Sequence, residues 1–345
     1  MVVRSNTPGP YPFTSNPDKG EESEMKFGTG TWIYGTVGDR YLLSGYRQGL
    51  DILERIERIA GIEDVSGIEM IYPADFGPGL EAVGEAIEAA GLDCYIVGVD
   101  LTGDPKWRYG TYSSKDAGIR REAVELTKET IDTAVSLGAE RINIWPGEDG
   151  HDYPFQADYT HSWNWFKECM VEVAEHNPDI SLCIEYKLRE PRVRSLISTT
   201  DRAVMMSNET GMDNVGVTID IGHALQAGEN VAESIALLSR NGRLFHVHLN
   251  DNYRGWDDDM VLGSVHMVEL LEMVYTLRTV DYTGWLSVDI YPYREDPGPA
   301  VAESVAYVKG LNAALDRIGM DVIAEALKGD DPIPLLSRIR EATLG

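Results

Sequence analysis

The chain has 345 residues, and 57 acidic against 30 basic side chains give it a formal net charge of −27. This acidic excess argues against nucleic-acid binding, because phosphate backbones attract basic surfaces. Hydrophobic residues make up 43% and charged residues 25%, which is typical of a soluble globular protein. No apolar run approaches the roughly 18 residues that a membrane span needs, so no membrane partner is expected.

The start of the chain predicts no folded element. Residues 1–24 are rich in Pro, Gly, Ser and Glu without hydrophobic periodicity, which predicts a flexible arm, and they lack the apolar stretch of a secretory signal. Cys94, Cys169 and Cys183 form no CxxC pair and are expected to be buried thiols. Together these features predict a cytoplasmic protein.

After the arm, short β-rich runs alternate with helical patterns. Eight strands are predicted, at 26–32, 67–72, 93–101, 141–145, 181–187, 215–221, 244–250 and 285–291. Helices are predicted between them, including 50–60, 119–137, 163–176, 231–239 and 268–277. Several of these helical patterns are followed by a glycine in the position where a left-handed residue often ends a helix: Gly61, Gly91, Gly138, Gly211 and Gly242.

This alternation predicts an α/β fold, a single (β/α)8 TIM barrel over residues 25–320. A doubly wound open sheet is the alternative, but the only Gly-rich candidate after an early strand is the short GTG at 28–30. Residues 321–345 exceed the eighth unit and predict a C-terminal helical extension.

Catalytic groups in such barrels gather at the carboxyl ends of the strands. Predicted strands five to eight carry polar side chains there: Glu185 and Lys187, Asp220 and His223, His246 and His248, and Asp289, with the acidic run Asp257–Asp259 after strand seven. Carboxylates buried together repel one another unless a cation neutralises them. Oxygen-rich sites with one or two His favour Mn²⁺ or Mg²⁺, and Co²⁺ also fits, so the sequence predicts a divalent metal site.

Three segments carry a resemblance to a known family: IWPGEDG at 144–150, DLTGDPKWRYGTYSSKD at 100–116 and HLNDNYRGWDDDMVLGS at 248–264. The first two are similar to the strand-four motif and strand-three loop of xylose isomerases. The third resembles the strand-seven loop of both xylose and L-rhamnose isomerases, metal-dependent (β/α)8 sugar enzymes. The resemblance covers roughly residues 26–300. It implies a small-molecule carbohydrate substrate and a homo-oligomer.

Carried over by position, the resemblance implies two metal sites. Glu185, Asp220, His248 and Asp289 would form the first, with His248 matching the L-rhamnose isomerase type. Asp220 would hold a second metal together with His223, Asp257 and Asp259. Lys187 matches the lysine that assists proton or hydride movement at C1–C2 of the sugar. Four further residues are the substrate-binding candidates, the first two as an apolar wall: Trp145, Trp32, Tyr72 and His246.

One departure from the isomerases lies at the end of strand two, where both have a ring-opening His. This chain has Tyr72 and Asp75 in that region, which makes Asp75 a catalytic candidate, and no His precedes His151. The acidic run Asp257–Asp259 and Lys187 favour an aldose–ketose isomerase acting at C1–C2, which we predict. The missing strand-two His and the presence of His151 favour a lyase instead, so we keep two alternatives. One is the large subunit of a C-glycoside deglycosidase, which cleaves the C–C bond of a 3-oxo-glycoside with His151 as base and has a small second subunit.

The other alternative is a sugar epimerase, although the related 3-epimerases have a Glu on strand eight where this chain has Asp289. A sugar-binding scaffold on a decayed barrel would be expected to lack ligands, yet all four residues of the first site are present. An apurinic-site endonuclease on a related barrel is disfavoured by the net charge.

Overall fold

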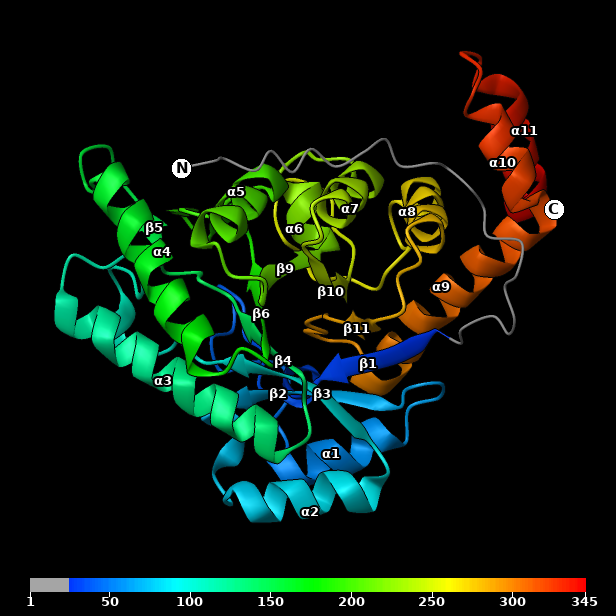
Figure 1. Ribbon diagram of the computed structural model, residues 1–345. Helices are drawn as coiled ribbons and strands as arrows, with labels where there is room; N and C mark the ends of the chain where they lie inside the picture. Colours follow the sequence, from blue (N-terminus) through cyan, green and yellow to red (C-terminus); the bar gives the residue numbers. More distant parts are fainter. Residues whose placement is uncertain (1–24) are drawn as a thin grey trace.

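The computed structural model describes residues 25–345, and the arm predicted at 1–24 lies outside the described residues (Figure 1). Eight parallel strands close into a barrel in the order β1-β11-β10-β9-β6-β4-β3-β2, which confirms the predicted TIM barrel. These strands are β1 (Lys26–Gly30), β2 (Gly67–Tyr72), β3 (Asp93–Val99), β4 (Arg141–Ile144), β6 (Ser181–Glu185), β9 (Val215–Asp220), β10 (Leu244–Leu249) and β11 (Trp285–Val288).

Helices cover the outside of the barrel (Figure 1). They are α1 (Ile52–Ala60), α2 (Leu80–Ala90), α3 (Ala117–Ser136), α4 (Tyr159–His176), α5 (Thr200–Thr210), α6 (Ile221–Gln226), α7 (Val231–Arg240), α8 (Met267–Thr279), α9 (Pro297–Ile318), α10 (Met320–Ala326) and α11 (Ile333–Leu344). Short 3₁₀ turns follow three of the strands: η1 (Thr31–Tyr34), η2 (Ala74–Phe76) and η3 (Pro105–Trp107). Within residues 25–345, no helix has the length and apolar character needed to cross a membrane.

Local sequence explains where the helices begin and which face they bury. Helix α1 starts at Asp51, whose side chain accepts a hydrogen bond from the N–H of Glu54, and it buries Ile52, Ile56 and Ile59 on one face. The same type of cap starts α3, α4 and α7. Four of the five predicted glycine ends have positive φ: Gly91, Gly138, Gly211 and Gly242.

Gly61 was wrongly predicted to be left-handed. Its φ is −84° because the chain continues its right-handed turn into Ile62, whose N–H donates to the carbonyl of Ile59. The predicted strands were also one to three residues too long at their carboxyl ends, except the second. The residues beyond the observed ends leave the sheet and enter the mouth of the barrel.

The amino-terminal end of the barrel interior is filled by aromatic and apolar side chains. Tyr95 stacks on Trp285 with 4.6 Å between ring centres, and both pack with Ile96 and Cys183. A Cβ at Gly67 would lie 2.5 Å from the Trp285 ring, so this strand position has room only for glycine. The three cysteines are free and buried, as predicted.

Two further features lie outside the barrel. A small antiparallel sheet forms from β5 (Gly150–His151), β8 (Val193–Ser195) and β7 (Arg189–Glu190), in the loops that follow β4 and β6. The predicted C-terminal helical end is present: α9 packs on α8, and α10 and α11 extend away from the barrel wall (Figure 1).

Candidate metal centre

The polar side chains predicted at the strand ends come together in the barrel mouth. Glu185 and Asp220 are the last residues of β6 and β9, His248 lies in β10, and Asp289 directly follows β11. Parallel pairing sets His248 beside Asp220 on one neighbouring strand and beside Ser287 on the other. One ligand atom from each of the four predicted first-site residues lies within 4.8 Å of the others.

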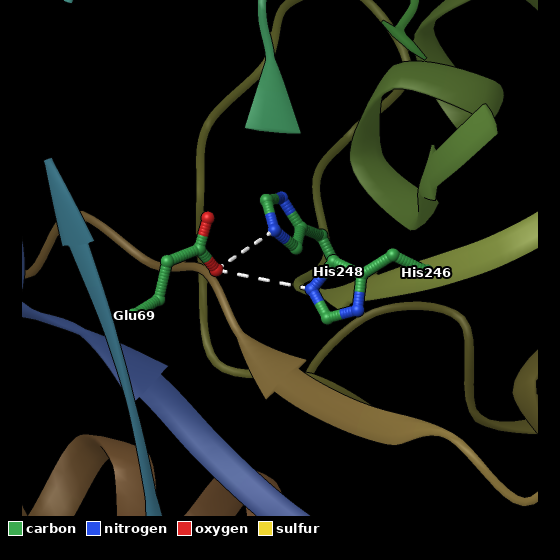
Figure 2. Close-up of side chains that lie close together, drawn as sticks. All are labelled: Glu69, His246 and His248. Atoms are coloured by element: carbon green, nitrogen blue, oxygen red, sulfur yellow. Dashed lines mark hydrogen bonds and ion pairs between the residues drawn. The ribbon is translucent and has the colours of Figure 1, made fainter. Parts of the chain in front are cut away.

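His248 is contacted by carboxylates on both ring nitrogens. Figure 2 shows the inner contact: Nε2 lies 3.1 Å from Oε2 of Glu69, which is buried in the middle of β2. His246 reaches toward the same oxygen, with its Nε2 3.8 Å away. Glu69 and both His side chains are buried, so this contact is shielded from solvent.

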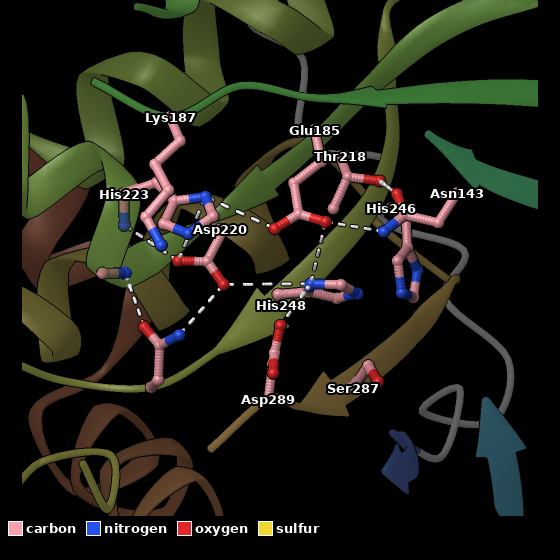
Figure 3. A network of polar contacts seen from close by, with 12 residues as sticks. Asn143, Glu185, Lys187, Thr218, Asp220, His223, His246, His248, Ser287 and Asp289 are labelled. Atoms are coloured by element: carbon pink, nitrogen blue, oxygen red, sulfur yellow. Dashed lines mark hydrogen bonds and ion pairs between the residues drawn. The ribbon is translucent and has the colours of Figure 1, made fainter. Parts of the chain in front are cut away.

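The outer nitrogen of His248 faces the other three members of the group (Figure 3). Its Nδ1 lies 3.0 Å from Asp289 Oδ2, 3.7 Å from Glu185 Oε2 and 3.8 Å from Asp220 Oδ2. Nδ1 is therefore the nitrogen of His248 that can bind a cation together with these carboxylates.

Neutral donors orient each of the three carboxylates. The side-chain amide of Asn143 donates to Glu185 Oε2 at 2.6 Å, and that of Asn250 donates to Asp220 Oδ2 at 2.9 Å. The indole N–H of Trp32 donates to Asp289 Oδ1 at 2.8 Å. The group is therefore held in place by side chains that add no charge to it.

A second group adjoins the first through Asp220 and contains His223 and Asp257, again with ligand atoms within 4.8 Å of one another. His223 is placed there because Asp220 caps α6, accepting from the N–H of His223 at 2.8 Å. His223 Nε2 lies 3.0 Å from Asp257 Oδ2. Asp259, also a predicted ligand, is not in this group: its φ is 46°, and its carbonyl accepts from the N–H of Tyr291.

Burial and mutual charge shift the pKa values of all four residues in the first group. Burial raises the pKa of Asp220 to about 7 against the opposing effect of His223, and burial also raises the pKa of Asp289. Burial would raise the pKa of Glu185 too, but the imidazole of His248 outweighs it and lowers that pKa. For His248, burial favours the neutral ring, yet Glu69 and Glu185 raise its pKa well above the usual value. Without a cation, protons retained on Asp220, Asp289 and His248 therefore reduce the repulsion between the carboxylates.

The second group behaves in the same way. Burial opposes the charged form of His223, but Asp220 and Asp257 raise its pKa to about 9. Burial and the charge of Asp257 raise the pKa of Asp259 well above its usual value. In such surroundings a divalent cation can replace the protons that the carboxylates and imidazoles hold.

The donor set fits a divalent metal. His248 Nδ1 and Asp257 Oδ2 are buried without a hydrogen-bond partner among the described residues, although each faces groups of opposite charge. The first group offers three carboxylates and one imidazole and contains no thiolate. Such ligands suit Mn²⁺ and Mg²⁺.

Lys187 lies beside the second group, on the segment that follows β6 (Figure 3). Its Nζ is 2.8 Å from Asp257 Oδ2, 2.5 Å from Glu190 Oε2 and 5.3 Å from the ring centre of Trp145. Burial disfavours its charge, but Asp257 and Glu190 raise the pKa of Lys187 well above its usual value. The side chain is therefore a fixed ammonium between an aromatic face and the centre.

Four other predicted site residues have different surroundings. His151 is half-buried in β5, with its ring centre 5.2 Å from that of Tyr159. The Tyr72 hydroxyl donates to Glu129 at 3.3 Å. Asp75 is buried and accepts hydrogen bonds from the Thr31 hydroxyl at 2.6 Å and the Ile71 N–H at 2.7 Å. His246 lies within the barrel interior beside His248, and burial lowers its pKa to about 4. None of these four residues belongs to either of the two ligand groups, although His246 forms a further cluster with Glu69 and His248.

The sequence did not point to Glu69, Asn143 or Ser287, and Asn250, at the end of predicted strand seven, was given no role. For Glu69 a signal exists, because a carboxylate stands among apolar residues in the strand GIEMIY, as it does in the strands of Glu185 and Asp220. The two amides and the serine carry no comparable signal, since short polar side chains occur in many strands.

Comparison with known proteins agrees with this geometry. The family model described as the xylose isomerase-like TIM barrel matches residues 57–311. The chain is 25% identical to the xylose isomerase of Thermus thermophilus and 24% identical to that of Thermus caldophilus, each over 288 residues, which is 79% of this chain and 74% of the relative.

Solved structures share the fold. An L-ribulose 3-epimerase structure superposes with a TM-score of 0.67 at 18% identity, covering 89% of this chain and 99% of that one. A 3-keto-D-glucoside 4-epimerase from E. coli gives a TM-score of 0.63 at 18% identity, covering 83% of this chain and 99% of that one. With the closed barrel, the two ligand groups and the family match over most of its length, the chain belongs to the xylose isomerase-like TIM-barrel family.

Proposed function

We propose that the protein is a divalent-metal-dependent, sugar-converting enzyme, and specifically an aldose–ketose isomerase acting at C1–C2 of its substrate. The observation that carries this proposal is the pair of adjoining ligand groups with the Lys187 ammonium beside them. The curated relatives named above are xylose isomerases, which supports a carbohydrate substrate.

When bound, a divalent cation supplies Lewis acidity to oxygens of the sugar. Glu185, Asp220, His248 and Asp289 would hold it at the first group, and His223 and Asp257 would join Asp220 at the second. In the isomerisation, the hydrogen on C2 moves to C1 and a proton passes from the C2 oxygen to the C1 oxygen.

The remaining residues bind and orient the sugar. The ammonium of Lys187 donates a hydrogen bond to the substrate oxygen on which negative charge develops, an interaction that strengthens toward the transition state. Trp145, on whose face this ammonium lies, offers an apolar wall, and Trp32 fixes Asp289 through its indole N–H.

A C-glycoside deglycosidase is the second candidate. The residues that replace the expected ring-opening His, Tyr72 and Asp75, bond instead to Glu129 and to Thr31. His151 in the loop after β4 would then be the base that removes a proton next to the carbonyl of a 3-oxo-glycoside. Exposed aromatic side chains in nearby loops, including Phe155, suit an aromatic aglycone.

An epimerase is the third candidate, because the solved structures that share this fold include an L-ribulose 3-epimerase and a 3-keto-D-glucoside 4-epimerase. Oligomer formation is supported by α11, which has no buried residue within the described chain and exposes Ile333, Leu336 and Leu344. We propose a homo-oligomer for the isomerase; the deglycosidase would instead pair with a small second subunit.

The test is metal analysis of the purified protein followed by a substrate panel with Mn²⁺. The panel contains free aldoses and ketoses beside a 3-oxo C-glycoside. Interconversion of an aldose and a ketose supports the isomerase, whereas release of the aglycone replaces it with the lyase. Bound metal without either activity would show that the proposed substrate class is wrong.

A further inference from the structure

A carboxylate lies on the inner side of the centre, where the sugar chemistry does not need one. Glu69 is fully buried in β2, and its Oε2 accepts hydrogen bonds from His248 Nε2 and from Ser287 Oγ, each at 3.1 Å. Ser287 Oγ is in turn 2.6 Å from the Tyr95 hydroxyl. Side chains from β3, β11 and β2 thus form one hydrogen-bonded chain that ends on the imidazole of His248.

A carboxylate can only accept hydrogen bonds, so this contact requires a hydrogen on Nε2 of His248. In a neutral imidazole with its hydrogen on Nε2, the lone pair of Nδ1 is free to bind a cation, and Nδ1 is the atom that faces Asp289, Glu185 and Asp220. We propose that Glu69 is a positioning residue that fixes the tautomer and ring orientation of His248, so that Nδ1 binds the metal. This inference rests on the metal centre of the proposed function, but it holds for any reaction carried out there.

The alternative is that Glu69 serves His246 or only packing. His246 Nε2 is 3.8 Å from Oε2, beyond hydrogen-bond distance, whereas the contact with His248 is within it (Figure 2). The same Oε2 also accepts from Ser287 Oγ, so Glu69 is an acceptor toward two neighbours, as a carboxylate is. Burying a carboxylate solely to fill space is unfavourable, because an apolar side chain fills the same volume without desolvation.

The test compares Mn²⁺ affinity, measured by titration calorimetry, among wild type, Glu69→Gln and Glu69→Met. Outer carboxylates of metal-binding His residues typically contribute about 10–100-fold to affinity, so Glu69→Met should bind Mn²⁺ weaker by about that factor. Glu69→Gln should fall between, because its amide oxygen still accepts a hydrogen bond while its amide nitrogen tolerates the other tautomer.

Glu229→Gln is the matched control. Glu229 also accepts hydrogen bonds within the fold, from the Tyr186 hydroxyl at 2.9 Å and from Thr200 N–H at 2.9 Å, but it belongs to neither ligand group. The same substitution there should change thermal stability and leave Mn²⁺ affinity within threefold of wild type. Circular dichroism of the metal-free proteins establishes that the compared variants are folded.

A second measurement needs no variant. Nitrogen NMR of the wild type labelled in its histidines and loaded with Mg²⁺ should show His248 with a protected hydrogen on Nε2 and none on Nδ1. A hydrogen on Nδ1, or a folded Glu69→Met that binds Mn²⁺ as wild type does, would overturn the inference. Wild type that binds Mn²⁺ but converts no sugar refutes the proposed isomerase and leaves this role intact. Wild type that binds no metal refutes both.

Discussion

The ammonium of Lys187 lies 2.8 Å from Oδ2 of Asp257, so the cation proposed to contact the sugar is anchored to a ligand of the second group. A buried pair of this kind fixes the position of Nζ, because moving either partner leaves the other charge unpaired. Because Asp257 belongs to the second group, a cation bound there would change the position and charge environment of Lys187.

Replacement of Lys187 should therefore separate chemistry from metal binding. Lys187→Met should lower kcat by about 10²–10⁴-fold, since the side chain acts on the reacting oxygens. The first ligand group does not include it, so bound metal there should persist. Steady-state kinetics and metal analysis measure the two effects, with Lys128→Met, which removes a lysine that pairs with Glu172 at the surface, as control. Unchanged kcat would remove Lys187 from the reaction.

Loss of a first-group carboxylate should abolish both metal binding and activity. Glu185→Gln and Asp289→Asn each keep the size of the side chain but remove one of the three negative charges, so affinity should fall by more than the roughly 10–100-fold of outer-sphere changes. Elemental analysis after dialysis gives the result, with Glu172→Gln at the surface as control. Full turnover by metal-free Glu185→Gln would contradict the whole scheme.

His151 distinguishes the two candidate reactions. As a half-buried residue of β5 outside both ligand groups, it should tolerate His151→Ala with less than threefold loss if the enzyme is an isomerase. In a deglycosidase the same change removes the base and should cost about 10²–10⁴-fold. His161→Ala, in the exposed first turn of α4, is the control for both assays.

Metal affinity should rise with pH. The pKa of Asp220 is raised to about 7 and that of His223 to about 9, so at lower pH both must release protons before they can act as ligands. Mn²⁺ binding should therefore release protons near pH 7, measurable by calorimetry in two buffers of different ionisation enthalpy. Equal heats in both buffers would contradict the ionisation described for these residues.

The same groups set the pH dependence of metal-free stability. A folded-state pKa above the unfolded value means that the folded protein holds a proton the unfolded chain has lost. Asp220 therefore contributes stability that declines from about pH 4 to 7, and His223 a further decline up to about pH 9. Melting temperatures with a chelator should fall across this range, and Mn²⁺ should restore them. A chelated protein that is most stable at pH 9 would contradict this.

Asp149 connects two loops at the mouth of the barrel through hydrogen bonds. Its buried carboxylate accepts hydrogen bonds from Thr111 N–H at 3.0 Å and Ser113 N–H at 2.6 Å, which joins the loop after β3 to the loop after β4. Asp149→Ala leaves these donors unsatisfied and should lower the free energy of unfolding by about 2–4 kcal/mol, measured in urea. Asp152→Ala, at a half-buried residue of the same loop that pairs with the exposed Arg192, should cost less than about 1 kcal/mol.

Much of the fold follows from periodicity, because each barrel strand is a short apolar run between turn residues. The carboxyl ends were less predictable. Lys187 and Asp289 continue their strands in sequence pattern but lie beyond the last ladder pairing, since there the chain turns into the mouth. Because parallel strands end at the same edge, the strand alternation predicted that the polar strand-end residues would gather at one mouth. The grouping of Glu185, Asp220, His248 and Asp289 came from the family resemblance, and their ligand atoms do lie within 4.8 Å of one another.

What the sequence did not supply is the set of contacts made across the barrel. Glu69 and His248 are 179 residues apart, and only the closed barrel brings the middle of β2 against β10. Asn143 and Asn250 orient carboxylates through hydrogen bonds whose partners depend on register and side-chain rotamer. The hydrophobic periodicity of the sequence carries no information on register or on side-chain rotamers.

The hydrogen bond from Trp32 to Asp289 spans the line where the first and last barrel strands meet. During synthesis, Glu185, Asp220 and His248 are therefore made before β11, the strand that closes the barrel, and before Asp289, the last carboxylate of the first group. Metal binding at the first group would then require the completed barrel, and truncation before residue 289 should abolish it. A cation at a free concentration of 100 times its Kd would stabilise the closed barrel by about 2.7 kcal/mol and would link the two ends of the barrel.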